Sequence, residues 1–123
     1  MKVYIAGPMT GIKHFNFPAF DRAQEHLLYS YEEVFSPADH DRKLVGRPQG
    51  WMPEESDSIG PWLKWAIPEA PSLRKMLGDD LDWICENATD MYMLQGWESS
   101  KGARTEHALA VALNLGITYE WRV

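Results

Sequence analysis

The sequence predicts one α/β domain over residues 1–123, with a small, doubly wound, mainly parallel sheet and helices on both of its faces. Short apolar runs alternate with segments of helical periodicity, which is the pattern of strands joined by crossover helices. The first apolar run, Val3 to Ala6, stops at a glycine loop, as a buried central strand does. With 123 residues, 45% of them hydrophobic, the chain is long enough for one core and too short for two.

Composition excludes several classes of partner. The formal charge is −6 and no run of Lys or Arg interrupts the acidity, so we expect no duplex nucleic acid as a partner. Cys85 is the only cysteine, which excludes an intrachain disulfide and favours an intracellular setting. The chain has no signal-type region and no apolar run of membrane length, so we expect a soluble, cytoplasmic protein.

The glycine loop after the first strand consists of Gly7, Pro8, Met9, Thr10 and Gly11. It follows the carboxyl end of a predicted strand, which is where open α/β sheets bind their ligands. It matches neither a Walker loop nor a dinucleotide fingerprint, so a simple tight turn explains it equally well.

The next segment predicts a helix that starts at Asn16 and Pro18 and runs to about Ser30. Its apolar residues recur at helical spacing: Phe20, Ala23, Leu27, Leu28 and Tyr31. A short strand from Glu33 to Pro37 follows and completes a β-α-β unit, for which a right-handed crossover is expected.

Between residues 38 and 71 the periodicity fails, and we expect a long loop that covers a functional site. Asp39, His40 and Asp41 have no further ligands at a recognised spacing, so this stretch predicts a polar loop and no metal. Residues 62–67 indicate a short helical turn.

Two consecutive helices are predicted next, one capped by Ser72 and ending near Gly78, and one over residues 79–85. Residues 90–94 then form a strand, and residues 117–121 form the last one. Strands that alternate with helices in this order predict a flavodoxin-like or Rossmann-like three-layer architecture.

The run from Gly96 to Gly116 follows a predicted strand. It begins with a turn of small residues and continues as an Ala/Leu-rich helix, which Gly116 can end. A helical wheel at about 100° per residue gives this helix a polar and an apolar side. The polar side holds Arg104, His107 and Asn114, and the apolar side holds Leu109, Ala110 and Leu113.

Glu106 falls among the apolar residues of this helix. A carboxylate there must be paired or face a cavity, because burying it bare is costly. We expect it in the first turn, where the helix dipole favours an ionised carboxylate. The same turn offers Ser99, Ser100 and unpaired N–H groups to a phosphate. A glutamate that merely stabilises the start of the helix is an equally weighted alternative.

Three segments together resemble the nucleoside 2-deoxyribosyltransferase superfamily. They are residues 5–11 with 16–20, then Asp80 and Leu81, then residues 94–103 with Glu106. Within that superfamily, the chain is similar to a small branch of phage and bacterial proteins of unassigned function. The resemblance covers both ends of the chain and hardly touches residues 42–71.

The resemblance implies two catalytic carboxyl groups and neither a metal nor a cofactor. Glu106 corresponds to the nucleophile that attacks C1′ of the deoxyribose, and Asp80 to the acid that handles the leaving base. Such a pair suits the chemistry, since one carboxylate can capture the oxocarbenium-like centre while the other group protonates the base. The chain carries a small insertion after Asp80, and Asp82 keeps the ungapped spacing. Asp82 is therefore the alternative acid, although Asp80 keeps the following apolar residues in register.

The resemblance also implies a phosphate site. In the related 5′-deoxynucleotide N-hydrolases, a serine six positions before the glutamate binds the 5′-phosphate, and Ser100 stands at that position. Ser99 and Gly102 belong to the same turn. The glycine loop, residues 7–11, would line the sugar and phosphate, with Tyr4 nearby.

The expected substrate is thus a 2′-deoxynucleoside 5′-monophosphate or the free deoxynucleoside. Hydrolysis and base exchange differ only in whether water or a second base takes the sugar from Glu106, and the sequence decides neither this nor the identity of the base. A phosphate site favours hydrolysis of the monophosphate. The alternative from another class is a catalytically silent nucleotide-binding protein, a sensor or sponge.

The tryptophans predict an assembly. Six are many for one small domain, and one core of this size is not expected to bury them all. Some are therefore expected at a subunit contact or over the ligand. The resemblance also implies symmetric dimers or higher assemblies, so we expect at least a homodimer. The six are Trp51, Trp62, Trp65, Trp83, Trp97 and Trp121.

Overall fold

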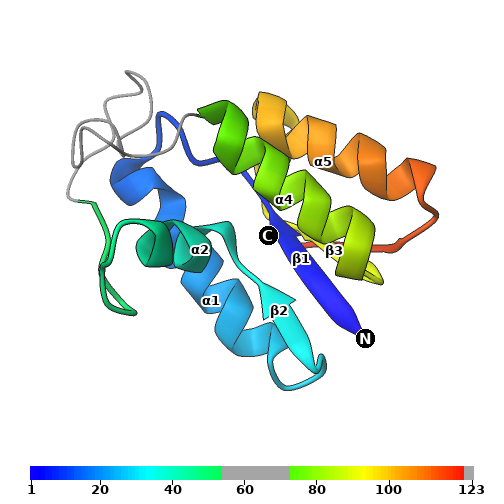
Figure 1. The fold of residues 1–123 in the computed structure, drawn as a ribbon, viewed down its shortest axis with the longest axis horizontal. Coiled ribbons are helices and arrows are strands. Elements are labelled where there is room, and N and C mark those ends of the chain that lie inside the picture. The colour runs from blue at the N-terminus through cyan, green and yellow to red at the C-terminus, as the bar shows by residue number, and fades with distance from the viewer. Residues whose placement is uncertain (54–72, 121–123) are drawn as a thin grey trace.

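The computed structural model describes residues 1–53 and 73–120, which form a four-stranded, all-parallel sheet (Figure 1). The strands lie in the order β2-β1-β3-β4. They are β1 (Lys2–Ala6), β2 (Glu33–Phe35), β3 (Asp90–Met93) and β4 (Gly116–Tyr119). In the register of the sheet, Val3 of β1 lies opposite Val34 of β2 and opposite Asp90 of β3. The carboxyl ends of the strands therefore meet at one edge.

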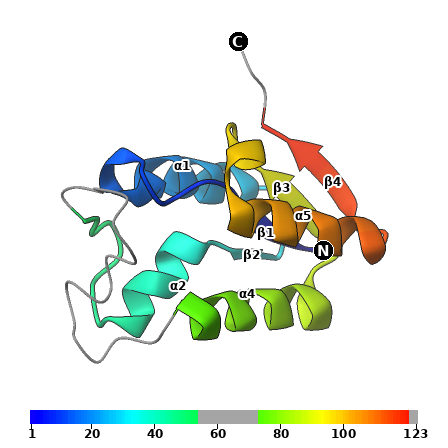
Figure 2. The same ribbon diagram turned by 90° about the horizontal axis from the view of Figure 1, so that it is seen from above.

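Four α-helices and two short 3-10 helices accompany the strands in the described ranges. They are η1 (Lys13–Asn16), α1 (Phe17–Leu27), α2 (Pro37–Leu44), α4 (Leu73–Asn87), η2 (Trp97–Ser99) and α5 (Lys101–Ala112). Figure 2 shows α1 and α4 on opposite sides of the sheet, and α5 shares the side of α4. The chain moves one way from β1 to β2 and the other way from β2 to β3, so right-handed crossovers place the helices on opposite faces. The predicted doubly wound, three-layer fold is confirmed.

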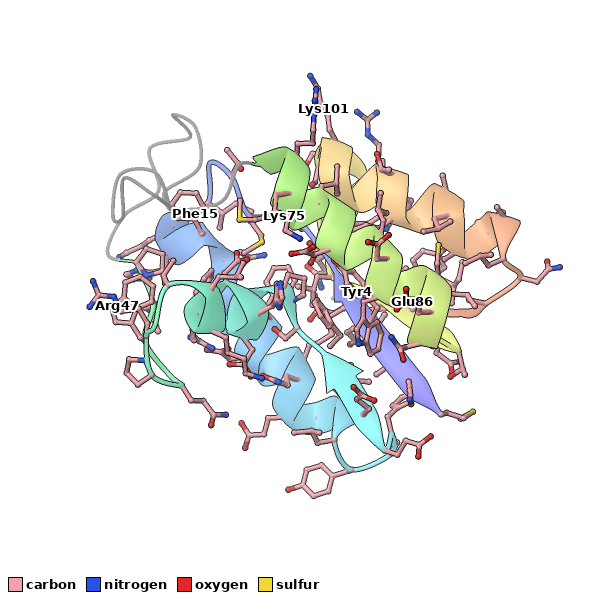
Figure 3. The ribbon with its side chains drawn as sticks, in the orientation of Figure 1. Tyr4, Phe15, Arg47, Lys75, Glu86 and Lys101 are labelled. Atoms are coloured by element: carbon pink, nitrogen blue, oxygen red, sulfur yellow. The ribbon has the colours of Figure 1, made fainter. Side chains whose placement is uncertain are left out.

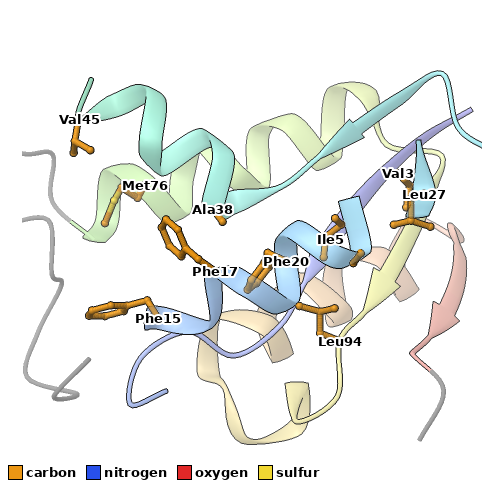
Figure 4. Packing of buried hydrophobic residues seen from close by; sticks show 11 residues of the cluster. Val3, Ile5, Phe15, Phe17, Phe20, Leu27, Ala38, Val45, Met76 and Leu94 are labelled. Carbon is orange, nitrogen blue, oxygen red and sulfur yellow. The ribbon is translucent and has the colours of Figure 1, made fainter. Parts of the chain in front are cut away.

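Alternation along β1 divides the core into two clusters. Val3 and Ile5 pack with the residues of α1, and Figure 4 shows this cluster with Phe20 in it. Tyr4 and Ala6 belong to the second cluster, under α4 and α5. Tyr4 is thereby placed on the same side of the sheet as the carboxyl groups of those two helices.

Residues 37–44 form the helix α2, where we expected a polar loop. Pro37 occupies the first helical turn, where its missing N–H does no harm, and Arg42 lies in the last turn, where the helix dipole favours a cation. The apolar periodicity is weak because Asp41 and Arg42, instead of apolar residues, take part in the buried side. Helix signals at the ends thus outweigh the missing periodicity.

The single helix α4 replaces the two helices predicted around Gly78. A glycine inside a helix costs about 1 kcal/mol relative to alanine, which is why the sequence predicts a break at Gly78. Across it, Nζ of Lys75 contacts Oδ1 of Asp79 at 2.7 Å, a pairing one helical turn apart that supports continuity. Asp80 consequently lies in the middle of α4 and not near a helix start.

The end of α5 also differs from the prediction. The helix stops at Ala112, and Asn114, with φ of 57°, makes the left-handed turn that Gly116 was expected to provide. Gly116 instead opens β4, where an added Cβ would lie 2.5 Å from Oδ1 of Asp90. A side chain at this position would therefore have to displace the carboxyl group of Asp90.

The helical wheel places Ala110 and Leu113 on the apolar side of α5. This is confirmed for Ala110, which is buried, and wrong for Leu113, which lies past the last helical residue and is 43% exposed. His107, placed on the polar side, stacks on the ring of Trp97 with centroids 4.3 Å apart. The predicted turn at residues 62–67, the cap at Ser72 and the strand residue Trp121 lie outside the described residues. Within the described ranges, no helix combines the length and apolar character needed to cross a membrane.

Candidate active site

A cavity of about 690 Å³ lies at the carboxyl end of β1, beside the start of α5. The strand order reverses at this edge of the sheet, which is where open α/β folds bind ligands. Figure 3 shows Tyr4 beneath α4 and Lys101 at the start of α5. The residues of the wall that bear on function are Gly7, Pro8, Met9, Thr10, Asp41, Asp80, Ser99, Ser100, Lys101, Gly102 and Glu106.

The glycine loop forms one side of this cavity. A Cβ at Gly7 would lie 2.7 Å from Cβ of Leu94, so only glycine lets the chain leave β1 this close to the end of β3. Asn16 ties the loop to the start of α1 by donating a hydrogen bond from Nδ2 to the carbonyl oxygen of Pro8, at 2.9 Å. Thr10 lines the cavity, whereas Gly11, also predicted as a contact, lies outside its lining and has φ of 86°.

Glu106 is the buried carboxyl group of α5, and it lies on the cavity wall. The hydroxyl of Tyr4, itself fully buried, donates a hydrogen bond of 2.6 Å to Oε2 of Glu106. Burial raises the pKa of Glu106 to about 8, the hydrogen bond from Tyr4 opposes this rise, and the charge of Asp80 adds to it. Because α5 begins at Lys101, Glu106 lies in its second turn. The helix dipole acts mainly on the first turn, so it contributes less here than expected.

Asp80 reaches the same cavity from α4. Burial raises its pKa to about 7, a hydrogen bond from Tyr4 lowers it, and the charge of Asp79 raises it. Tyr4 therefore interacts with both carboxyl groups, and burial together with these two acids raises its own pKa well above 10. At pH 7 these pKa values leave Glu106 mostly protonated and Asp80 partly ionised.

Asp82, the alternative acid, does not reach the cavity. Its side chain is exposed, and it is absent from the wall to which Asp80 belongs. Two residues apart on a helix means about 200° around the axis, so Asp80 and Asp82 face opposite directions. The placement favours Asp80.

The start of α5 offers hydrogen-bond donors and a positive charge to the cavity. Ser100 is the N-cap, and its Oγ accepts a hydrogen bond of 3.2 Å from the N–H of Ala103. Ser99 donates from its Oγ to the carbonyl oxygen of Gly96 at 2.8 Å. Lys101 lies on the wall beside the two serines. Helix-start N–H groups, a serine hydroxyl and a lysine together suit a phosphate.

Asp41 and Arg42 of α2 are buried charged residues that were not predicted as parts of a site. Asp41 lies on the cavity wall, and burial raises its pKa to about 8, with a further contribution from Asp80. Arg42 donates to the two carboxyl oxygens of Asp21 at 2.8 and 2.7 Å and to Asp39 at 3.2 Å. This clamp fastens α2 to α1 and so fixes the position of Asp41.

No group of three or more His, Cys, Asp or Glu side chains is arranged to hold a metal ion in the part of the chain that the structure describes. Asp39 instead accepts hydrogen bonds from Arg42 and from Gln24, at 3.2 and 3.1 Å. His40 packs on the ring of Phe35, with centroids 5.2 Å apart.

The three described tryptophans have ring partners within the chain. Trp83 lies 4.9 Å from the ring of Phe35, Trp97 stacks on His107, and Trp51 meets an aromatic ring of α1 edge-on. They therefore supply no argument for a subunit contact or for stacking on a ligand. The other three, Trp62, Trp65 and Trp121, lie outside the described residues.

This fold and this cavity define a doubly wound α/β protein with a carboxyl-lined pocket at the carboxyl edge of its sheet. The chain belongs to the family described as "Domain of unknown function (DUF4406)", whose profile matches residues 1–56 and 64–119. Comparison with curated proteins and with solved structures gives no match.

Proposed function

We propose that this protein cleaves the N-glycosidic bond of a 2′-deoxynucleoside 5′-monophosphate, or of the free deoxynucleoside, through a covalent intermediate on Glu106. The observation that carries the proposal is the meeting of Glu106 and Asp80 in one cavity, with the hydroxyl of Tyr4 donating a hydrogen bond to Glu106 and lowering the pKa of Asp80. Cleavage of this bond needs an ionised Glu106 and a protonated Asp80. In the free protein the pKa of Glu106, about 8, lies above that of Asp80, about 7, so the proton must move from Glu106 to Asp80 when the substrate binds.

In the first step, a carboxylate oxygen of Glu106 forms a bond to C1′ while the bond from C1′ to the base nitrogen breaks. The electron pair leaves with the base, which takes the proton held by Asp80. Before the attack, Tyr4 stabilises the charge of Glu106 through the 2.6 Å hydrogen bond. In the second step, water attacks C1′, gives a proton to Asp80 and frees the sugar and Glu106. A second base in place of water makes the reaction a transfer.

The start of α5 supports a phosphorylated substrate. Ser100 and Lys101 lie on the same wall as Glu106, within the same helix, so a 5′-phosphate bound there holds the sugar beside the nucleophile. A transferase that acts on unphosphorylated nucleosides has no use for such a group. We therefore favour hydrolysis of a monophosphate.

One observation favours a second candidate, a nucleotide-binding protein without turnover. The pKa of Glu106, about 8, leaves this carboxyl group largely protonated in the free protein at neutral pH, and a protonated carboxyl group is a poor nucleophile. The cavity and the phosphate-binding residues at the start of α5 would then serve to bind a nucleotide without cleaving it.

Release of free base separates the two candidates. Wild type is incubated at ample enzyme concentration with each of the four deoxynucleoside 5′-monophosphates and with the corresponding deoxynucleosides, and the base is detected by chromatography. The Glu106→Gln variant is the control, because the amide keeps the shape but cannot form the covalent bond. We expect base from wild type and a rate several orders of magnitude lower from the variant. Tight binding without base would establish the second candidate.

A further inference from the structure

Asp41 is a carboxyl group that the proposed reaction does not use. It lies in α2, only 9% exposed, and its side chain lines the cavity that also contains Asp80 and Glu106. The two catalytic candidates are linked through Tyr4, whereas Asp41 reaches the cavity from a different helix. Asp41 therefore bounds the cavity from the side of α2, near enough to Asp80 for the two charges to interact.

The carboxyl group of Asp41 has no hydrogen-bond or ion-pair partner among the described residues, although Asp41 is followed directly by an arginine. Arg42 is occupied by Asp21 and Asp39, which hold its guanidinium group on the side of α1. Leaving a largely buried polar group without a partner is unfavourable. A carboxyl group that faces a cavity gains its partner when a ligand binds there.

The surroundings of Asp41 indicate its protonation state. Burial raises its pKa to about 8, and the charge of Asp80 on α4 adds to the rise. The other charged groups on the wall, Glu106 and Lys101, come from α5, and Asp21 on α1 is bound to Arg42. A neutral carboxyl group presents one O–H donor and one C=O acceptor side by side.

The rest of the wall near α2 is apolar. Phe20, Pro37, Met76 and Leu77 line the cavity together with Asp41. Apolar walls with one donor and acceptor pair suit a flat heterocycle that carries a complementary pair on its edge. The amide and amidine edges of nucleobases have this pattern, an N–H donor beside a nitrogen or oxygen acceptor.

We propose that Asp41 is a substrate-binding residue that binds the edge of the leaving base through a paired donor and acceptor. The proposal rests on the proposed function for the identity of the ligand. It assigns the phosphate to the start of α5, the sugar to Glu106, and the outer edge of the base to α2. Asp80 then remains the group that protonates the base.

Isothermal titration of nucleotide binding tests this, with the four deoxynucleoside 5′-monophosphates as probes. The purified variants are Asp41→Asn, whose amide keeps one donor and one acceptor, and Asp41→Leu, which has neither. Asp82→Asn, an exposed position on α4, is the matched control. Circular dichroism verifies that each variant is folded. Binding is measured at pH 6.5 and at pH 9.5, and base release is measured in parallel.

At pH 6.5 we expect Asp41→Asn to bind within about twofold of wild type and Asp41→Leu to bind about 10- to 100-fold more weakly. At pH 9.5 wild type should lose affinity relative to Asp41→Asn, because only wild type loses the donor at this position. Asp80 and Glu106 titrate in both proteins, so the ratio of their two affinities reports on the ionisation of Asp41 alone.

Equal affinity of a folded Asp41→Leu variant and wild type would overturn the proposal, and so would a loss in Asp41→Asn as large as in Asp41→Leu. Absence of binding of all four probes to wild type at millimolar concentration overturns it as well. If wild type binds with the expected pattern but releases no base, the assignment of Asp41 stands and the glycosidase function fails. The two failures are thus distinguishable.

Discussion

The hydroxyl of Tyr4 donates a hydrogen bond of 2.6 Å to Oε2 of Glu106, across 102 residues of sequence. One partner lies in the first strand and the other in the last described helix, and both are buried. A hydrogen bond to an ionised carboxylate is stronger than one to a neutral acid, so it stabilises the charged form of Glu106. The contact therefore affects what fraction of Glu106, the proposed nucleophile, is ionised.

Replacing Tyr4 by Phe removes this hydrogen bond and keeps the ring. The stacking on Phe35, with centroids 5.2 Å apart, is retained, so the variant should fold. We expect the pKa of Glu106 to rise and the acid limb of the pH profile of kcat to move to higher pH. Near neutral pH, kcat should fall about 10- to 100-fold, because this factor corresponds to the free energy that a hydrogen bond to a charged group contributes. An unchanged acid limb would contradict this role of Tyr4.

In the proposed mechanism, replacing Asp80 by Asn removes the proton for the leaving base. We expect a loss of about 100- to 10,000-fold in kcat for natural bases. A 4-nitrophenyl deoxyriboside needs no protonation on leaving, so its cleavage should be much less affected. Asp82→Asn is the matched control on the same helix, and it should stay within twofold of wild type because Asp82 is exposed. A larger loss in Asp82→Asn than in Asp80→Asn would reverse the assignment.

The strands could be predicted from local pattern, whereas α2 could not. Val3 to Ala6 reads as a buried strand because all four residues are apolar, and it is one. The buried side of α2 instead contains Asp41 and Arg42, whose burial depends on Asp21 in another helix. Local periodicity contains no information on an ion pair between two helices, so the sequence predicts a loop at these residues.

The candidate site divides in the same way. The resemblance pointed to Glu106, Asp80 and Ser100, and the structure places all three on one cavity. The choice between Asp80 and Asp82 required the direction in which α4 faces, which depends on its continuity through Gly78. Asp41 could not have been found, because its importance comes from a cavity that α2 closes only in the folded chain.

The phosphate site can be tested at Ser100 without damage to the helix cap. Asp and Asn are both good N-caps, so Ser100→Asp and Ser100→Asn should keep the stability of α5. Only the Asp variant adds a negative charge at the proposed anion site. We expect its KM for deoxynucleoside monophosphates to rise at least about tenfold over that of the Asn variant, with no difference for unphosphorylated deoxynucleosides. Equal KM values of the two variants for the monophosphates would refute the proposed phosphate site at Ser100.

The protein is expected to form at least a homodimer, as the resemblance implies. The end of α5 exposes apolar side chains, with Val111 54% and Leu113 43% exposed. Light scattering at micromolar concentration should give about twice the 14.1 kDa of one chain. If this end of α5 contributes to the contact, a Val111→Lys and Leu113→Lys double variant should shift the mass toward one chain. A mass of one chain for wild type with full activity would show that each chain forms a complete site.

The buried carboxyl groups predict an unusual dependence of stability on pH. Asp41, Asp80 and Glu106 have pKa values raised to about 8, 7 and 8, whereas in the unfolded chain carboxyl groups titrate near 4. Between about pH 4 and pH 8 the folded protein therefore binds more protons than the unfolded chain. The free energy of unfolding must fall as pH rises through this range.

Thermal unfolding of wild type at pH 5.5 and pH 8.5 measures this effect, and variants isolate it. His40 acts in the opposite direction below about pH 6.5, because burial lowers its pKa, so the comparison with variants is the decisive one. Glu106→Gln and Asp80→Asn carry no charge at either pH. Each should have a Tm at pH 8.5 above that of wild type by about 4 °C or more, and a much smaller difference at pH 5.5. A variant less stable than wild type at pH 8.5 would mean that the carboxylate is compensated in the fold and that the raised pKa is wrong.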